Sequence, residues 1–263
     1  MTRLGAAVFV GAARNCARFL PESLDRWRDL GGLFENPHFI VAENDSTDGT
    51  KALLETWRSA GPCREVLTLD GMAGQERSVA IAQARNALLD HVAARPDLAG
   101  ADYLIVMDMD DASLSITPAT LARCMAFDGW DGLFANQLFY FNDVWALRHP
   151  ARSPDDWAAR VDATPVGWRR AAARLRYLTW RNRPIVPWHR PFEVDSAFGG
   201  LAVYRMRHAL RGRYLGFRDG RAVCEHFPYN EQLKAGGARL FLHPELINMA
   251  PYPIHQLVRR VLS

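Results

Sequence analysis

Short apolar runs alternate with stretches of helical periodicity through the first half of the chain. The runs have the length of buried strands, and glycine or polar clusters end them. Between the runs, hydrophobic residues recur at the spacing of an amphipathic helix. The pattern predicts strands over residues 6–11, 39–42, 64–69 and 103–107, and helices over residues 17–30, 51–58 and 77–94.

This alternation of strands and helices predicts an α/β fold with a mostly parallel sheet and helices on both faces. In such sheets, ligands bind beyond the carboxyl ends of the strands. The two densest polar clusters, residues 43–48 and 108–111, each follow a predicted strand directly. The sequence therefore predicts a binding site at this edge of the sheet.

Three carboxylates, Asp108, Asp110 and Asp111, follow the fourth predicted strand. They would repel one another unless a positive group lies among them. A hard divalent cation such as Mg²⁺ or Mn²⁺ meets that need and also holds a substrate diphosphate. The alternative interpretation is a solvated acidic turn that leads into the next helix, with Ser113 or Thr117 as its N-cap.

Two further polar features precede these acids. Residues 43–50, Glu-Asn-Asp-Ser-Thr-Asp-Gly-Thr, carry more hydrogen-bonding groups than a turn requires. Part of this segment is expected to cap the helix that begins near Lys51, and the surplus carboxylates can accept from a nucleobase or a ribose. Arg85, in Ala84-Arg85-Asn86, can neutralise a phosphate or pair with an acid. A turn and a solvated helix arginine are the plainer interpretations of each feature alone.

In this order and spacing, the motifs resemble those of the GT-A glycosyltransferases. Residues 43–50 are similar to the D-D-x-S-x-D-x-T element of that superfamily, residues 84–86 to its ARN element and residues 108–111 to its DxD element. The form Glu-Asn-Asp-Ser-x-Asp-Gly-Thr is closest to the capsule-associated mannosyltransferase-like family, with the family-2 glycosyltransferases second. The resemblance covers residues 5–135 well and residues 195–253 more loosely.

The resemblance implies a metal-dependent glycosyltransferase that uses a nucleotide-sugar donor, with Mn²⁺ or Mg²⁺ as cofactor. It implies that Glu43 and Asp45 contact the base or the ribose and that Arg85 lies near the diphosphate. Asp110 and Asp111 would hold the metal, with Asp108 alongside. The implied acceptor is a glycan or a lipid-linked sugar, in the synthesis of a surface polysaccharide.

Two later segments extend the resemblance. Gly199 and Gly200 begin a segment similar to the strand that lines the donor sugar, although a tight turn explains the pair equally well. Glu225 and His226 fall where the superfamily has a catalytic carboxylate or a further metal ligand. His226 would bind the metal, with a simply packed histidine as the alternative. Glu225 would be the general base of an inverting enzyme, with Asp195 as a competing candidate.

The usual family-2 pattern has an acidic pair in place of Glu225-His226, whereas the capsule-associated relatives are believed to retain configuration. The identity of the base and the stereochemistry therefore both stay open.

The middle of the chain is rich in arginine and tryptophan. Residues 145–190 contain ten arginines and five tryptophans against three aspartates and no glutamate. Trp168, Ala172, Leu175 and Leu178 share one face of a helix predicted over residues 168–181. Such a surface can bind lipid diphosphates, rest on an anionic membrane or stack on sugar rings, and solvated arginines around core tryptophans are the alternative. We expect the segment to face the acceptor or a membrane.

The composition fits one globular domain. The 263 residues are 49% hydrophobic and 23% charged, and the net charge of +3 is too small to indicate nucleic-acid binding. We expect a single GT-A domain over residues 1–263, with a donor-binding half (1–135) and an acceptor-binding half (136–263) that carries a helical insertion near residues 148–190. Dispersed cysteines and the lack of a long apolar run predict a cytoplasmic protein, with peripheral contact to the inner membrane as an option.

Two other functions compete with sugar transfer. A nucleotidyltransferase also uses a metal and a doubly wound sheet, but it would show a phosphate loop rich in glycine and lysine after the first strand. Residues 11–15, Gly-Ala-Ala-Arg-Asn, contain one glycine and no lysine. The second competitor is a non-catalytic nucleotide-sugar-binding or glycan-binding relative, and the presence of Asp108, Asp110 and Asp111 argues against it.

Overall fold

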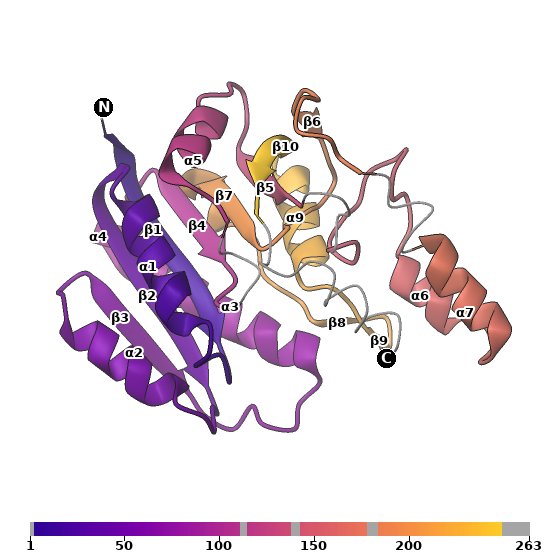
Figure 1. Cartoon of the computed structure of the whole chain (residues 1–263), viewed down its shortest axis with the longest axis horizontal. Coiled ribbons are helices and arrows are strands. Elements are labelled where there is room, and N and C mark those ends of the chain that lie inside the picture. The colour runs from indigo at the N-terminus through magenta and orange to yellow at the C-terminus, as the bar shows by residue number, and fades with distance from the viewer. Residues whose placement is uncertain (1–2, 111–114, 138–142, 178–183, 249–263) are drawn as a thin grey trace.

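The computed structural model describes residues 3–110, 115–137, 143–177 and 184–248. Its centre is an eight-stranded sheet in the order β3-β2-β1-β4-β7-β5-β10-β6, and β8 and β9 form a separate hairpin (Figure 1). The strands are β1 (Leu4–Ala13), β2 (Phe34–Asn44), β3 (Arg64–Leu69), β4 (Tyr103–Met107), β5 (Gly132–Asn136), β6 (Phe192–Glu193), β7 (Leu201–Arg205), β8 (Phe217–Arg218), β9 (Arg221–Ala222) and β10 (Leu240–Ile247). The helices are α1 (Leu20–Gly31), α2 (Thr50–Ser59), α3 (Arg77–Ala93), α4 (Pro96–Ala99), α5 (Pro118–Met125), α6 (Trp157–Asp162), α7 (Trp168–Leu175), α8 (Met206–Ala209) and α9 (His226–Ala235).

The sheet is mostly parallel, as the sequence pattern predicts. Strands β3, β2, β1 and β4 run parallel to one another, and β5 runs parallel to β10. Strand β7 runs antiparallel between β4 and β5 and so joins the two halves of the sheet. The parallel strands β1, β2 and β4 therefore end at one edge, where residues 43–48 and 108–110 follow β2 and β4.

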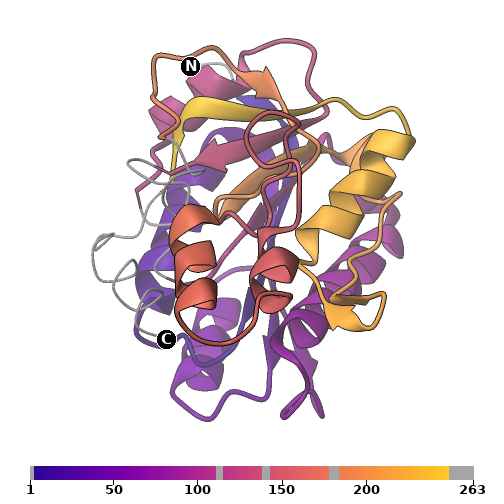
Figure 2. The same ribbon diagram turned by 90° about the vertical axis from the view of Figure 1, so that its right-hand side faces the viewer.

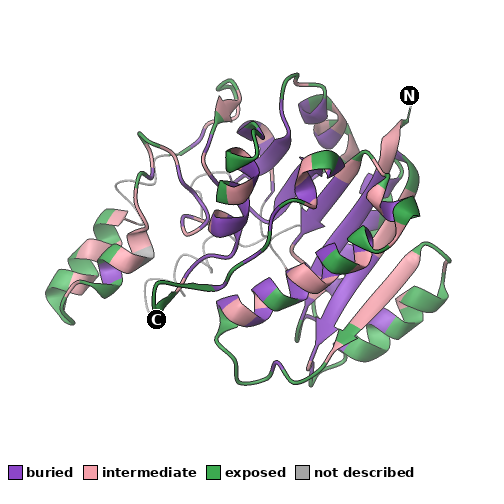
Figure 3. Cartoon of the chain, turned by 180° about the vertical axis from the view of Figure 1, so that it is seen from behind, coloured by how far each residue is buried: buried purple, intermediate pink, exposed green. Residues whose placement is uncertain are grey.

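Both faces of the sheet are buried, which explains why its strands read as nearly continuous apolar runs. Along β1, Val8 and Val10 belong to the apolar cluster under α3 and α9, whereas Ala7 and Phe9 belong to the cluster under α1 and α5. Figure 3 shows the buried sheet between helices whose outer faces are exposed. Burying each large apolar side chain contributes about 1.5–3 kcal/mol, so the two clusters fix the strand ends that carry the polar groups.

Helix α3 carries the Ala84-Arg85-Asn86 motif and begins at a side-chain cap. The Glu76 carboxylate accepts hydrogen bonds from the backbone N–H groups of Ser78 and Val79. Ala80 and Ala84 are buried in the cluster beneath the helix. Because small side chains let a helix approach a sheet closely, α3 lies against β1 and β2 along this face.

The arginine- and tryptophan-rich segment forms the hairpin of α6 and α7, which stands away from the sheet (Figures 1 and 2). Helix α7 buries none of its residues. The predicted helix begins at Trp168 as expected and ends at Leu175, while Leu178, Trp180 and Arg181 lie outside the described residues. Among the helices in the described ranges, none is both long enough and apolar enough to span a bilayer.

Candidate functional site

Asp108 and Asp110 lie at the carboxyl end of β4 and line a cavity of about 340 Å³. Met109 between them is 2% exposed and packs in the apolar cluster that contains Trp27. The backbone N–H of Asp108 donates to the Gly200 carbonyl at 3.0 Å, which ties the acidic segment to the start of β7. Successive side chains of an extended segment point to opposite sides. Because Met109 points into the core, Asp108 and Asp110 on either side of it point toward the cavity. Asp111 lies outside the described residues.

The cavity is polar and carries both charges. Its lining residues come from the ends of β1, β2 and β4, the start of α3 and the loop before it. They are Ala12, Ala13, Arg14, Cys16, Asn44, Gln75, Arg77, Ala80, Ile81, Arg85, Asp108, Met109 and Asp110. Three arginines facing two aspartates make a site in which an anion and a cation can be bound side by side. Arg14, Gln75 and Arg77 were not predicted from the sequence, because none of them belongs to a recognised motif. Asn44 lies in the motif of residues 43–50 but was not singled out there as a site residue.

Arg85 is a buried cation at the wall of this cavity. Its Nη2 donates to Asp108 Oδ1 at 3.1 Å, and its Nε lies 3.3 Å from Glu225 Oε1. The guanidinium lies over the ring of Phe198 at 4.8 Å and over that of Tyr214 at 5.6 Å. Burial opposes its charge, but Glu225 and Asp108 outweigh that cost and raise the pKa of Arg85. Arg85 is therefore a permanent positive charge, held in place on both faces.

Asn86 fixes the surroundings of Arg85 from the next position of the same helix. Its Nδ2 donates to the Tyr214 carbonyl and its Oδ1 accepts from the Tyr214 N–H, each at 2.9 Å. The Tyr214 ring stacks on Tyr229 at 4.1 Å between ring centroids. Asn86 thereby holds the loop that supplies one wall of the arginine site.

Asp108 is the most perturbed carboxylate of the described site. Burial and the neighbouring Asp110 raise its pKa to about 8, Arg85 partly opposes the shift, and Asp143 and Glu225 add to it. Asp143 was not predicted from the sequence. Its Oδ2 accepts a hydrogen bond from the Gly199 N–H at 3.1 Å, which brings a further negative charge to this end of the sheet. The cluster holds more negative charge than Arg85 alone balances.

The raised pKa of Asp108 predicts a pH-dependent stability of the metal-free protein. The folded protein keeps the proton up to about pH 8, whereas the unfolded chain releases it near the usual 3.8. Between these values the folded state binds more protons, so the free energy of unfolding falls as pH rises. Between about pH 5 and pH 8, we expect the free energy of unfolding to fall less for Asp108→Asn than for the wild type. Urea titrations at each pH, with a chelator present, measure this. Parallel pH profiles of the two proteins would contradict this.

The segment of residues 43–50 is largely occupied by its own hydrogen bonds. Glu43 is 1% exposed, and its Oε1 accepts from the Ser46 N–H at 2.8 Å. Asp45 accepts from the Gly71 and Met72 N–H groups at 3.1 and 2.7 Å, which bridges this loop to the one before α3. Burial opposes ionisation of Asp45, but these backbone hydrogen bonds outweigh it and lower its pKa. Contact of Glu43 and Asp45 with a base or ribose stays a prediction.

Gly199 and Gly200 form the tight turn that leads into β7. Both have positive φ angles, +67° and +83°, which glycine adopts without strain. A Cβ on Gly199 would lie 2.5 Å from the Ala135 carbonyl oxygen, so the turn also requires a close approach to β5. These contacts account for the glycines structurally, and their predicted contact with a donor sugar stays a prediction.

Glu225 and His226 lie beside Arg85, at the start of α9. The His226 ring is 2% exposed and stacks on Phe198 at 3.8 Å between ring centroids. Among the described residues neither ring nitrogen has a hydrogen-bond partner, and Nε2 lies 3.5 Å from Glu225 Oε1. Burial, reinforced by Arg85, lowers the pKa of His226 well below its usual 6.5, so the imidazole is neutral. A neutral imidazole is the form that binds metals.

Asp195 lies apart from this group. Its Oδ1 accepts from Lys234 Nζ at 2.7 Å, and its side chain is 47% exposed. Lys234 is near the far end of α9 from Glu225, about 13 Å along the helix at 1.5 Å per residue. The structure thus brings Arg85, Asp108, Asp110, Glu225 and His226 to one region but leaves Asp195 outside it.

The acidic end of the sheet fits a divalent cation in its chemistry. Asp108 and Asp110 supply the oxygen ligands that Mg²⁺ and Mn²⁺ prefer, and a cation would relieve the repulsion that raises the pKa of Asp108. Within the described ranges, no three His, Cys, Asp or Glu side chains are already arranged around one point as a metal site. Asp111, the second predicted ligand, lies outside those ranges.

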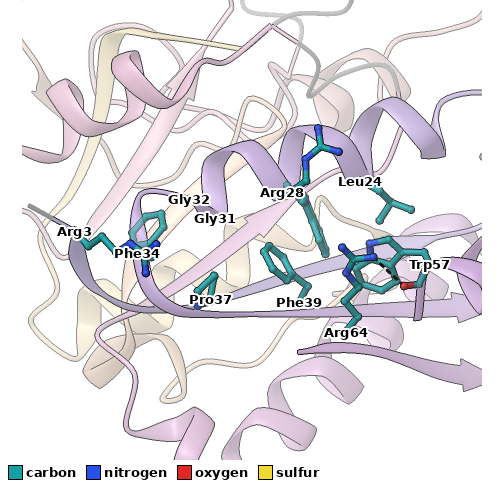
Figure 4. A pocket seen from close by; sticks show the side chains of 11 residues that line it. Arg3, Leu24, Arg28, Gly31, Gly32, Phe34, Pro37, Phe39, Trp57 and Arg64 are labelled. Carbon is teal, nitrogen blue, oxygen red and sulfur yellow. Dashed lines mark hydrogen bonds between the residues drawn. The ribbon is translucent and has the colours of Figure 1, made fainter. Parts of the chain in front are cut away.

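A second hollow, of about 240 Å³, lies between α1, β2 and α2 and differs in chemistry (Figure 4). Trp27 and Phe39 stack in its floor at 6.1 Å between ring centroids. The Arg64 guanidinium lies 5.6 Å from the Trp57 ring at its rim. No carboxylate lines this hollow. The cavity at Asp108 and Asp110 is therefore the one of the two that suits a metal and a diphosphate.

A family model described as glycosyl transferase family 2 matches residues 9–184. The chain belongs to that family. The matched region contains residues 43–50, Arg85 and the acids at 108–111, so the motifs singled out in the sequence lie inside it. Family 2 is the second of the two families that the motifs resemble. No curated protein matches the chain.

Solved structures share the fold. The chain matches the mannosyltransferase PcManGT from Pyrobaculum calidifontis, in complex with GDP-Man and Mn²⁺, with a TM-score of 0.54 and 16% identity over 99% of this chain and 61% of that one. It matches S. aureus TarS with a TM-score of 0.49 and 14% identity over 98% of this chain and 64% of that one. The chain thus spans less than two thirds of either protein. The first likeness shows a GT-A fold.

Proposed function

We propose that this chain transfers a sugar from a nucleotide-diphosphate sugar in a reaction that depends on Mn²⁺ or Mg²⁺. The observation that carries the proposal is that Asp108, Asp110 and Arg85 line one cavity, with Arg85 donating to Asp108. Carboxyl groups next to a fixed positive charge suit a metal-bound diphosphate, and the raised pKa of Asp108 shows that its negative charge is not yet balanced. Membership of glycosyl transferase family 2 supports the same reaction class.

In this proposal, Asp108, Asp110 and Asp111 hold the metal, which neutralises charge on the departing nucleoside diphosphate. Arg14 and Arg77 line the same cavity and are available to the phosphate oxygens. Fixed cations aimed at the leaving group stabilise charge that develops in the transition state. Asn44 also lines the cavity and supplies amide hydrogen-bonding groups for the base or the ribose. The GDP-Man and Mn²⁺ bound by PcManGT support this class of donor.

Glu225 is the better placed of the two candidate bases. It lies 3.3 Å from Arg85 Nε in the wall of the donor site, whereas Asp195 pairs with Lys234 at the far end of α9. We propose that Glu225 acts on the acceptor hydroxyl if the reaction inverts, and that in either stereochemistry it holds Arg85 in position.

The exposed face of α7 is the proposed contact with a membrane that carries a lipid-linked acceptor. Trp168 is 77% exposed and Leu175 is 63% exposed on the same helix, and Val166 just before it is 84% exposed. Arg169 and Arg174 belong to the same helix, which contains no acidic residue. Apolar side chains flanked by arginines favour an anionic bilayer surface.

Removing the apolar part of this face is expected to weaken membrane binding. We expect the double variant Trp168→Ser/Leu175→Ser to bind phosphatidylglycerol vesicles at least about tenfold more weakly than the wild type, because it loses most of the apolar area available for insertion. Vesicle co-sedimentation measures this. Leu53→Ser, at an exposed leucine of α2, is the matched control and should bind as the wild type does. Failure of the wild type to bind, or equal binding by the double variant, would contradict the membrane contact.

A donor screen tests the proposed reaction. GDP-mannose and UDP-glucose are incubated with the protein and Mn²⁺ or a chelator, with and without glycan acceptors, and nucleotide release and donor binding are measured. Transfer or hydrolysis that requires the metal is the expected result. Metal-dependent binding with no release from any donor would favour the competing non-catalytic function.

A further inference from the structure

A cavity of about 590 Å³ lies between α6, the loop that precedes it and strand β9 of the β8–β9 hairpin. Its lining residues come from the loop before α6, from α6 itself and from β9. They are Trp145, Trp157, Ala159, Asp162, Ala163, Arg221 and Ala222. None of them lines the cavity at Asp108 and Asp110, so this is a separate space.

The cavity combines two indole rings with few polar groups. Trp145 and Trp157 contribute aromatic surface, and both indole N–H groups are buried with no acceptor among the residues that the structure describes. Asp162 is exposed, and within the described residues no cation or donor is paired with its carboxylate. A sugar ring presents an apolar face of C–H groups and a rim of hydroxyls. Indole rings can pack against the apolar face, and the Asp162 carboxylate and the Arg221 guanidinium can hydrogen-bond the hydroxyls.

We propose that this cavity binds a sugar ring of the acceptor glycan, with Trp145 and Trp157 against the ring and Asp162 and Arg221 at its hydroxyls. Calling this sugar the acceptor rests on the proposed function, whereas the binding of a sugar in the cavity does not. The acceptor part is then an uncharged saccharide rather than a lipid diphosphate.

Charge decides between those two ligands. Arg221 Nη1 lies 3.2 Å from Asp156 Oδ2, and Arg148 Nη2 lies 3.5 Å from the same oxygen. The arginine at the cavity wall is therefore already shared with an acid, and Asp162 adds a further negative charge. A diphosphate would meet little net positive charge here and would bind weakly. The binding of a neutral sugar does not depend on net positive charge. The basic groups that suit a phosphate lie instead on α7.

The cavity is continuous along the chain with the proposed catalytic region. Ala222 in its wall precedes Glu225 by three residues, which an extended chain spans in at most about 11 Å. Trp145 follows Asp143 by two residues, and Asp143 accepts from Gly199 beside the acids. The wall of the cavity is therefore close along the chain to Glu225, the candidate base, and to Asp143, as a site for the acceptor requires.

Indole NMR tests the proposal without using turnover. The Nε1–H resonances of the full chain, labelled at tryptophan, are assigned with single Trp→Phe variants. They are then titrated with α-1,2-mannobiose, maltose, cellobiose and N,N′-diacetylchitobiose, with no nucleotide or metal present. We expect saturable shifts of the Trp145 and Trp157 resonances with at least one of these sugars, and no shift of Trp27 or Trp168.

Two variants separate sugar binding from a general packing effect. Trp157→Ala is expected to weaken the binding of that sugar between about twofold and tenfold. Asp162→Ala removes an exposed carboxylate with little risk to folding and is expected to weaken it as well. Because sugar binding is measured without nucleotide or metal, the absence of a donor reaction in the wild type would overturn the proposed function but not sugar binding. Shifts with none of the four sugars, or unchanged affinity in both variants, would overturn the inference.

Discussion

Replacing Asp110 with alanine is expected to lower the rate of metal-dependent nucleotide release from the donor by at least about a thousandfold. Asp110 and Asp108 line one cavity at the end of β4. If the metal bridges these carboxylates to the diphosphate, loss of one ligand removes both the metal and its charge on the leaving group. Initial rates of nucleotide release at saturating Mn²⁺ and donor measure the effect.

The matched control for this prediction is Asp25→Ala. The Asp25 side chain is 65% exposed on α1 and pairs with Arg28 at the surface. It should therefore change the rate by less than about twofold, because it lines no part of the donor cavity. Equal rates for wild type and Asp110→Ala would remove Asp110 from the reaction.

Replacing Arg85 with leucine is expected to lower the free energy of unfolding by about 3–5 kcal/mol. Arg85 is 7% exposed and pairs with Asp108 and Glu225. Because Asp108 keeps its proton below about pH 8, the carboxylate left without its cation at neutral pH is that of Glu225. Uncompensated buried charge is costly because the surrounding protein screens it poorly. Urea unfolding monitored by circular dichroism measures the change.

Two further variants identify the cause of that loss. Arg77→Leu changes an exposed arginine at the start of the same helix, and its stability should lie within about 0.5 kcal/mol of the wild type. Adding Glu225→Leu to Arg85→Leu removes the carboxylate that Arg85 would leave without a cation and should recover part of the loss. If the double variant is no more stable than Arg85→Leu, charge imbalance is not the reason.

The first half of the fold, residues 1–135, could be predicted because local pattern and tertiary structure agree there. Residues 64–69 and 103–107 are strands in the structure as the sequence predicts, and β1 and β2 extend further than predicted into less apolar residues. Strand β5 (Gly132–Asn136) and strand β10 (Leu240–Ile247) were not predicted. Both are buried in the other half of the sheet, where partners distant in sequence decide the structure.

Site residues could be predicted where a polar motif directly follows a predicted strand. They could not be predicted where the folded chain brings in a residue from a distant segment. Asp108 and Asp110 follow β4 directly, and Arg85 from the middle of α3 donates to Asp108, so the structure places the three side chains around one cavity. Their roles in donor and metal binding stay predictions. Asp143 carries no signature in the sequence. Its carboxylate accepts from Gly199, which is 56 residues further along the chain, so its place near the site depends on the tertiary fold.

Calorimetric binding of a nucleoside diphosphate tests the central claim most directly. GDP and UDP are titrated into wild type and Asp110→Asn with Mn²⁺, and again with a chelator. The account predicts that at least one nucleotide binds the wild type only when Mn²⁺ is present, and that Asp110→Asn binds it at least about tenfold more weakly. Binding that is equally strong without the metal, or unchanged in the variant, would contradict a donor site built on these acids.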